Sequence, residues 1–207
     1  MLDINEAMIF AAGFGKRMYP FTTKVPKPLL KVNGKPIIFY IIEDLINLNF
    51  KNIVINTHHL SEKFHDVLKP YSRIIKIVFE EEILDTGGGF LNAIKRNYFH
   101  NLKSPKVLIN GDVLWKKTVN SPIKNILRNW NEEKMDLLLC MINKRFFFGY
   151  KGKGDFNLEE PQKEISRLNL EQQKDFVFSG LQIIKPKLLQ KKNEKKFSMR
   201  EIFFSNI

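Results

Sequence analysis

A glycine-rich turn and three basic side chains follow the first apolar run of the chain, Ala7 to Ala12, which has the pattern of a strand buried on both faces. Gly13 and Gly15 allow a tight turn in which successive backbone N–H groups face an anion. The basic residues after the turn are Lys16, Arg17 and Lys27. Arginine offers a planar fork that matches phosphate oxygens, and Lys27 lies between two prolines that restrict its backbone. The sequence therefore predicts a triphosphate site.

Two common phosphate-binding loops do not fit this turn. A dinucleotide-binding fingerprint requires a third glycine where Met18 stands. A P-loop requires a hydroxyl residue directly after its Gly-Lys pair, and Arg17 occupies that position here. A bare glycine turn is the alternative without a ligand, but the pattern G-x-G-x-R-x-x-P followed by P-K-P is more specific than a turn requires.

A second polar group, Asn110-Gly111-Asp112, follows the apolar run from Lys106 to Ile109. Ligands of open α/β sheets gather at the carboxyl ends of the strands, where the glycine turn also emerges. A carboxylate at that edge can hold Mg²⁺ beside the phosphates, so Asp112 is the predicted metal ligand. The alternative is a turn aspartate, because Asn-Gly-Asp is a common turn composition.

Apolar runs and helical periodicity alternate along the chain up to Phe146. We expect strands at 7–12, 53–56, 73–79, 106–109 and 135–142, and helices at 37–48, 61–71, 90–97 and 121–133. This alternation predicts an α/β protein with a parallel sheet and right-handed crossovers. Beyond Phe146 the pattern predicts antiparallel strands at 164–170 and 175–184, and helices at 187–190 and 197–207.

Four further local patterns differ in whether they indicate a ligand. The run Glu80-Glu81-Glu82 is typical of a solvated turn. Three glycines, 87–89, precede an expected helix and leave bare backbone that a flat group can approach. His58 and His59 are neighbours that point to opposite faces of an extended segment, which favours a structural or hydrogen-bonding role over a metal site. Cys140 lies in an apolar run and is expected in the core.

The 207 residues are enough for one α/β domain with its own core. A single cysteine excludes an intramolecular disulfide, the N-terminus does not resemble a signal peptide, and no apolar stretch is long enough to cross a bilayer. We therefore expect a cytoplasmic protein without a membrane partner. The net charge of +12 fits a nucleic-acid binder, but the lysines are spread along the chain and the Phe residues lie within apolar runs, which disfavours nucleic acid.

Six segments spread over nearly the whole chain resemble the sugar-1-phosphate nucleotidylyltransferases. These segments are A-A-G-F-G-K-R-M-Y-P, P-K-P-L, D-T-G-G-G, N-G-D-V, G-K-G-D-F and F-S-G-L. The resemblance implies a Rossmann-like α/β/α sandwich with a mostly parallel mixed sheet, in one domain over 1–207. Within it, 1–145 would be the nucleotide-binding half and 146–207 the sugar-phosphate-binding half. The implied reaction joins a nucleoside triphosphate and a sugar 1-phosphate, releases pyrophosphate and uses Mg²⁺.

The resemblance also implies roles for individual residues. Those implied to bind the nucleotide are Ala12, Gly13, Gly15, Lys16, Arg17, Lys27, Gly87 and Gly88, the last two against the base and ribose. Those implied to bind the sugar phosphate are Asn110, Asp155, Ser179 and Gly180. The implied catalytic residues are Arg17, Lys27 and Asp112, and Asp112 holds the metal. A solvated turn carboxylate is the alternative for Asp155, and a purely structural role is the alternative for Ser179.

Within the family, T-G-G-G and G-K-G-D-F favour the uridylyltransferases that act on N-acetylmuramate 1-phosphate in cell wall recycling. A guanylyltransferase that uses GTP and mannose 1-phosphate is an alternative. Family members also carry a second metal-binding aspartate after a tryptophan, at a position beyond Ile207, so we expect either a C-terminally truncated chain or a naturally short protein that lacks this ligand. A non-catalytic module that binds nucleotide sugars is therefore a further alternative, and the oligomeric state stays open.

Overall fold

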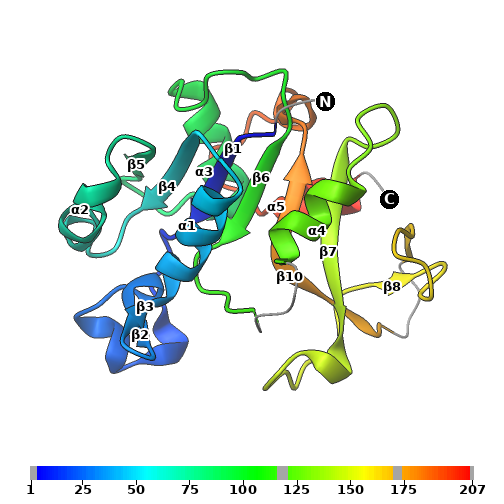
Figure 1. Cartoon of the computed structure of the whole chain (residues 1–207), viewed down its shortest axis with the longest axis horizontal. Coiled ribbons are helices and arrows are strands. Elements are labelled where there is room, and N and C mark those ends of the chain that lie inside the picture. The colour runs from blue at the N-terminus through cyan, green and yellow to red at the C-terminus, as the bar shows by residue number, and fades with distance from the viewer. Residues whose placement is uncertain (1–3, 116–120, 170–173, 206–207) are drawn as a thin grey trace.

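The computed structural model describes residues 4–115, 121–169 and 174–205, which are built around one six-stranded sheet (Figure 1). The strand order is β5-β4-β1-β6-β10-β7. In that order the strands are Ile75–Phe79, Asn52–Thr57, Glu6–Phe10, Lys106–Asn110, Phe176–Ile184 and Leu137–Asn143. The four strands β5, β4, β1 and β6 are parallel, and β10 is antiparallel to both of its neighbours. The expected mostly parallel mixed sheet is confirmed.

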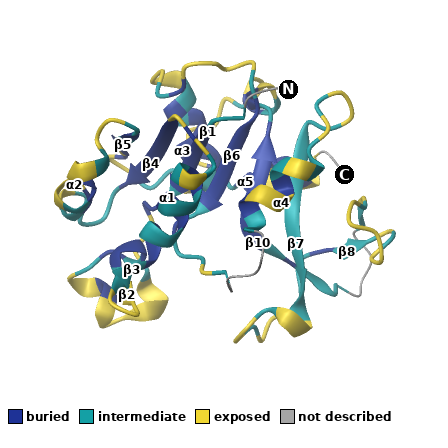
Figure 2. Cartoon of the chain, in the orientation of Figure 1, coloured by how far each residue is buried: buried dark blue, intermediate teal, exposed yellow. Residues whose placement is uncertain are grey.

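Helices cover both faces of this sheet, and each face has its own apolar core. One core contains side chains from α1 (Ile37–Asn47), α2 (Glu62–Leu68) and α4 (Pro122–Asn129). The other contains side chains from α3 (Asp85–Lys95) and α5 (Met199–Phe204). Figure 2 shows the central strands buried between these layers, which explains why their sequences are nearly continuous apolar runs. The architecture is an α/β/α sandwich.

Short elements complete the fold. Two small antiparallel pairs are formed by β2 (Lys31–Val32) with β3 (Lys35–Pro36), and by β8 (Asn157–Leu158) with β9 (Leu168–Asn169). Turns of 3₁₀ helix are Lys16–Met18, Phe21–Thr23, Lys27–Leu29, Lys69–Tyr71, Lys144–Phe146 and Pro186–Leu189. Among the described residues, no helix is both long enough and apolar enough to cross a membrane.

Some element boundaries differ from the sequence prediction. The first strand ends at Phe10, so Ala11 and Ala12 belong to the loop that follows it. The helix expected at 90–97 begins at Asp85 and contains all three glycines. The helix expected at 197–207 begins at Met199, directly after a Ser198 capping box, and its last two expected residues lie outside the described part of the chain. Contacts with distant segments set the end of β1 and the start of α3, and local periodicity does not report such contacts. The start of α5 is set by its own capping box.

A buried ion pair lies at the amino ends of the central strands, at the opposite end of these strands from the candidate site. The Nζ atom of Lys106 is 3.1 Å from Glu6 Oε2, and the side chains are 0% and 5% exposed. Backbone groups complete the site, because Lys106 also donates to the carbonyl oxygens of Asn101 and Ser104. Buried charges require such full pairing. The pair therefore holds β1 and β6 together at their amino ends, opposite the candidate site.

Candidate active site

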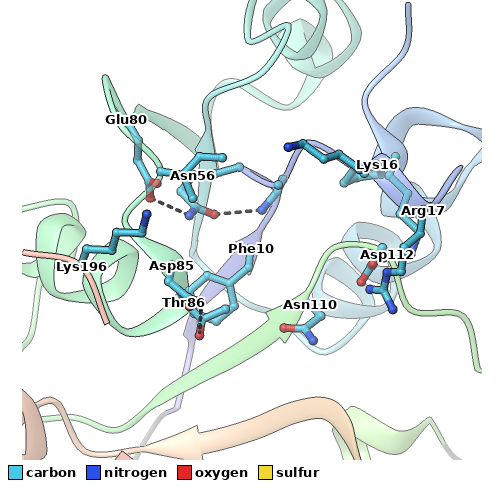
Figure 3. A pocket seen from close by; sticks show the side chains of 17 residues that line it. Phe10, Lys16, Arg17, Asn56, Glu80, Asp85, Thr86, Asn110, Asp112 and Lys196 are labelled. Atoms are coloured by element: carbon cyan, nitrogen blue, oxygen red, sulfur yellow. Dashed lines mark hydrogen bonds and ion pairs between the residues drawn. The ribbon is translucent and has the colours of Figure 1, made fainter. Parts of the chain in front are cut away.

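A pocket of about 420 Å³ lies at the carboxyl ends of the parallel strands, where the sequence predicted a phosphate site (Figure 3). Several parts of the chain form it: the loop after β1, the turn at Lys27, the ends of β4 and β6, the segment from β5 into the first turn of α3, and a segment near Lys196. The predicted residues that line it are Ala12, Gly13, Gly15, Lys16, Arg17, Lys27, Asn110 and Asp112. The fold thus brings most of the predicted nucleotide site into one pocket.

The turn after β1 depends on Gly15. Its φ of +65° lies in the left-handed region, and a Cβ atom there would be 3.0 Å from Thr22 Cγ2 and 3.2 Å from Lys27 Cβ. The hydroxyl of Thr22 donates to the Gly15 carbonyl at 2.9 Å. Gly15 therefore allows the loop that carries Lys27 to pack directly against the turn. Around Gly13, by contrast, no heavy atom lies within 4 Å of the ideal Cβ position.

The two adjacent histidines support this turn through hydrogen bonds. His58 Nδ1 lies 2.8 Å from the Glu80 carbonyl oxygen, and His59 Nε2 lies 3.2 Å from the Thr22 carbonyl oxygen. Both imidazole rings also contact the ring of Phe14, at centroid distances of 5.4 and 5.6 Å. The structural role expected for these histidines is confirmed.

Lys27 and Asp112 form an ion pair at the wall of the pocket. Lys27 Nζ donates to Asp112 Oδ2 at 2.6 Å, and the side chains are 25% and 32% exposed. Gly111 places Asp112 here, because its N–H donates to the Phe10 carbonyl at 2.8 Å and a Cβ would lie 2.7 Å from that oxygen. The sequence predicted both charged residues separately but did not predict that they pair. A phosphate could replace the carboxylate as the partner of Lys27.

Asp112 also suits the predicted metal. The described part of the chain contains no group of three or more His, Cys, Asp or Glu side chains that could hold a metal ion. Mg²⁺ does not require such a group, because it usually keeps waters and is held by one or two carboxylates plus substrate phosphates. A carboxylate beside cationic side chains at the wall of this pocket therefore fits Mg²⁺ carried in with a nucleotide, and Asp112 would hold it.

Glu80 is a site residue that the sequence analysis missed. It was expected in a solvated turn, but only Glu81 and Glu82 are exposed, while Glu80 is 2% exposed and lines the pocket. Its Oε1 accepts from Asn56 Nδ2 at 2.7 Å, and its Oε2 accepts from the Leu84 N–H at 3.2 Å. Burial raises the pKa of Glu80, although these hydrogen bonds act in the opposite direction.

Asn56 connects Glu80 to the loop after β1. Its Oδ1 accepts from the Ala11 N–H at 2.9 Å while its amide donates to Glu80. The backbone of Ala11 is therefore held by a side chain at the point where β1 stops pairing with its neighbours. A polar residue at the end of an otherwise apolar strand, N-I-V-I-N-T, was the sequence feature that could have indicated this role.

The glycines of α3 are not open to the pocket as expected. A Cβ at Gly87 would overlap the ring of Phe197, and a Cβ at Gly88 would overlap the Lys195 carbonyl. Both glycine N–H groups donate to the Phe197 carbonyl, at 2.9 and 3.0 Å. The space that the missing side chains leave is thus filled by the chain itself, because these first-turn N–H groups need acceptors. The room expected here for a base and ribose is absent.

Contacts between β6 and β10 bring the four predicted sugar-phosphate residues near one another, but of the four Asn110 alone lines this pocket. Asn110 lines the pocket, and Gly180 with φ +84° allows it close approach, since a Cβ there would be 2.7 Å from Asn110 Nδ2. Asp155 instead pairs with Arg200 at 2.6 Å and accepts from the Phe178 N–H at 3.0 Å. Ser179 is buried in the wall of a different cavity.

That second cavity, of about 790 Å³, lies between α4 and β7 and has largely apolar and aromatic walls. Asp112 borders both cavities, so this carboxylate stands at their junction. Cys140 lies in the wall of the second cavity and packs on the larger core. Burial raises the pKa of its thiol, partly offset by Ser179, which agrees with the expected core role.

Comparison with known proteins gives a consistent family. The family model described as nucleotidyl transferase matches residues 6–146. The chain is 27% identical over 199 residues to N-acetylmuramate alpha-1-phosphate uridylyltransferase of Caulobacter vibrioides, covering 88% of this chain and 76% of that protein. It is 33% identical over 113 residues to mannose-1-phosphate guanyltransferase of Schizosaccharomyces pombe, covering 53% and 31%. It spans less than half the length of several other relatives.

A solved structure supports the fold. A crystal structure of UDP-glucose pyrophosphorylase in complex with UDP-glucose superimposes with a TM-score of 0.75 at 16% identity. The superposition covers 98% of this chain and 86% of that one. At this identity the likeness establishes the shared α/β/α architecture.

Proposed function

Because the chain belongs to the nucleotidyl transferase family and, within it, to the sugar-1-phosphate nucleotidyltransferases, we propose that its pocket transfers a nucleoside monophosphate to a sugar 1-phosphate. The observation that carries the proposal is the meeting of the glycine turn, Lys16, Arg17 and the Lys27–Asp112 pair in one pocket. Backbone N–H groups and cations suit a triphosphate, and a carboxylate beside them suits the Mg²⁺ that accompanies the phosphates.

In this reaction a phosphate oxygen of the sugar 1-phosphate attacks the α-phosphorus, and the bond to the leaving pyrophosphate breaks. The turn at Gly13 to Arg17 would bind and orient the triphosphate through N–H groups and positive charge. Lys27 would leave Asp112 and donate to a phosphate oxygen. Mg²⁺, held by Asp112 when bound, would neutralise phosphate charge. Asn110 would contact the sugar phosphate, because it borders the same pocket.

The preferred substrates in this proposal are UTP and N-acetylmuramate 1-phosphate. The name and 88% coverage of the Caulobacter vibrioides relative support this choice, as do the D-T-G-G-G and G-K-G-D-F segments. A cytoplasmic role in cell wall recycling would follow. The division into a nucleotide-binding half, 1–145, and a sugar-phosphate-binding half, 146–207, belongs to the same proposal.

The second candidate is a guanylyltransferase that takes GTP and mannose 1-phosphate. The 33% identity to the Schizosaccharomyces pombe protein favours it. A module that binds nucleotide sugars without turnover is the third candidate, because Asp112 is the single predicted metal ligand in the pocket.

A pyrophosphate-release assay separates these candidates. The full chain is incubated with Mg²⁺, each of UTP, GTP, CTP, ATP and dTTP, and either N-acetylmuramate 1-phosphate or mannose 1-phosphate. We expect release that requires both substrates and is fastest with UTP and N-acetylmuramate 1-phosphate. Fastest release with GTP and mannose 1-phosphate would select the second candidate. Nucleotide binding without pyrophosphate release in any combination would support the non-catalytic module.

A further inference from the structure

A strap, defined as residues Lys195 to Met199, crosses the first turn of α3 and reaches the pocket. Its central residue is fixed in both directions, because the Phe197 N–H donates to the Leu84 carbonyl and the Phe197 carbonyl accepts from two glycine N–H groups. The Met199 N–H donates to Thr86 Oγ1 at 3.0 Å. The Phe197 ring is 4% exposed and fills the space over Gly87. These contacts fix which residue of the strap lies over each residue of the first turn of α3.

Because Phe197 is fixed, the two lysines before it face different cavities. Lys196 lines the candidate pocket. Lys195 lines a separate cavity on the outer side of α3, together with Glu82 and Arg96. Two adjacent side chains of the same type, both exposed, therefore have different surroundings.

Lys196 lies at the end of the pocket opposite the phosphate-binding cations. Figure 3 shows Arg17 and Asp112 at one end, the Lys16 side chain running from that end toward Asn56, and Lys196 pointing toward Glu80 at the other end. A nucleoside triphosphate held by its phosphates at the first end would extend its base toward the second. The base would then meet an ammonium group next to a buried carboxyl group.

This pair of groups has a defined hydrogen-bonding preference. An ammonium can only donate, and in the described part of the chain no ion pair occupies the one on Lys196. Glu80 cannot move away from its position, because Asn56 and the Leu84 N–H hold its two oxygens. A donor at this end favours a base that carries an oxygen at C4 of a pyrimidine or C6 of a purine, as uracil and guanine do. It disfavours the exocyclic amino group that cytosine and adenine carry at the same edge.

We propose that Lys196 is a specificity-determining residue, which donates a hydrogen bond to the exocyclic oxygen of an oxo base and selects against amino bases. The inference rests on the proposed function and adds the class of base that the pocket accepts. It also gives the strap a role, because the glycines of α3 allow the strap to hold Lys196 at the base end of the pocket.

The test compares Lys196→Met with Lys195→Met, which removes the same charge from the neighbouring residue outside the pocket. The kcat/KM values of UTP and CTP, and of GTP and ATP, are measured in competition, and melting temperatures are measured with each nucleotide. We expect wild type and Lys195→Met to prefer the oxo base in each pair. Lys196→Met should reduce that preference about ten- to a hundred-fold, which corresponds to one charge-assisted hydrogen bond. Lys196→Arg should restore part of it.

Three outcomes overturn the inference alone, and the first two are turnover by wild type without preference for oxo bases and an unchanged preference in Lys196→Met. An equal loss of preference in Lys195→Met would also overturn it, since general charge would then be the cause. If wild type neither releases pyrophosphate nor is stabilised by any nucleotide, the proposed function fails and the inference fails with it. The melting temperature without nucleotide reports whether each variant is folded.

Discussion

At the scale of single residues, two charged groups of the pocket are bonded to each other and a third is bonded to a neutral amide. Lys27 holds Asp112 at 2.6 Å, and Glu80 is bonded to Asn56 at 2.7 Å. Substrate binding at the first pair is therefore an exchange of partners, in which a phosphate replaces a carboxylate at the lysine. Such an exchange keeps both charges compensated, which lowers the cost of holding them in a partly enclosed site.

Glu6 gives a prediction for pH. Burial alone would raise its pKa, but hydrogen bonds from the His100 N–H and Asn52 and the charge of Lys106 outweigh burial and hold the pKa below its ordinary value of 4.5. A lowered pKa means that the folded state favours the ionised form, so this stabilisation is present above about pH 4.5 and is lost as the pH falls through the folded pKa. Melting temperatures between pH 7 and pH 3 measure it, and we expect them to decline below about pH 5.

The comparison is between Glu6→Gln and Glu43→Gln, because Glu43 forms an exposed pair with Lys35. Glu6→Gln leaves Lys106 buried without its counter-charge, so it should lower stability at pH 7 by roughly 3 kcal/mol and flatten the acid decline. Glu43→Gln should change neither by a measurable amount. If the melting temperature declined by the same amount at low pH in both variants, carboxylates other than Glu6 would be the cause of the decline. Glu80 has the opposite effect on the pH dependence of stability. Because its pKa is raised, its contribution to the stability of the folded protein falls as the pH rises above 4.5.

At the scale of elements, α3 and the strap depend on each other. Glycine weakens an isolated helix by about 1 kcal/mol relative to alanine, yet α3 carries three in a row in its first turns. Each is explained by a neighbour: the Phe197 ring at Gly87, the Lys195 carbonyl at Gly88, and the Glu80–Asn56 pair at Gly89. The three glycines lower the intrinsic stability of the helix, but they leave space in which the strap and the Glu80–Asn56 pair pack against it.

Gly88→Ala should therefore destabilise the protein, although alanine is the better helix former. The added methyl group overlaps a backbone carbonyl, which cannot rotate away, and the strap must shift. We expect a loss of about 1–3 kcal/mol, and a melting temperature lower by about 2–4 °C for each kcal/mol. Gly13→Ala is the control, because no heavy atom lies within 4 Å of its ideal Cβ. A more stable Gly88→Ala protein would show that the strap does not pack as described.

At the scale of the whole molecule, features that depend on local pattern were predicted and are confirmed. The order of strands and helices, the glycine turn after the first strand and the polar turn ending in Asp112 follow from apolar runs and punctuating glycines. Because the carboxyl ends of parallel strands meet at one edge, the same reasoning placed the turn and Asp112 close together. The family was identified from the same segments.

Features that depend on contacts between distant segments were not predicted. The burial of Glu80 comes from Asn56, 24 positions earlier, and the start of α3 at Asp85 comes from the strap, more than 100 positions later. The pairing of Asp155 with Arg200 likewise joins distant residues. Periodicity within a window of the sequence carries no information on these partners. Composition gave the wrong expectation for Glu80, because three consecutive glutamates usually lie in solvent.

The proposed function requires that this pocket binds the nucleotide and that Asp112 acts in its transfer. The most direct measurement compares nucleotide affinity and Mg²⁺-dependent turnover in Asp112→Asn and Arg17→Ala. Asp112→Asn keeps the shape and the acceptor for Lys27, so nucleotide affinity should fall by less than about ten-fold while turnover falls on the order of 10²–10³-fold. Arg17→Ala removes a phosphate contact, so affinity should fall about ten- to a hundred-fold together with turnover. Near-normal Mg²⁺-dependent turnover in Asp112→Asn would contradict the account and move the search for the metal ligand to Asp85 and Asp155.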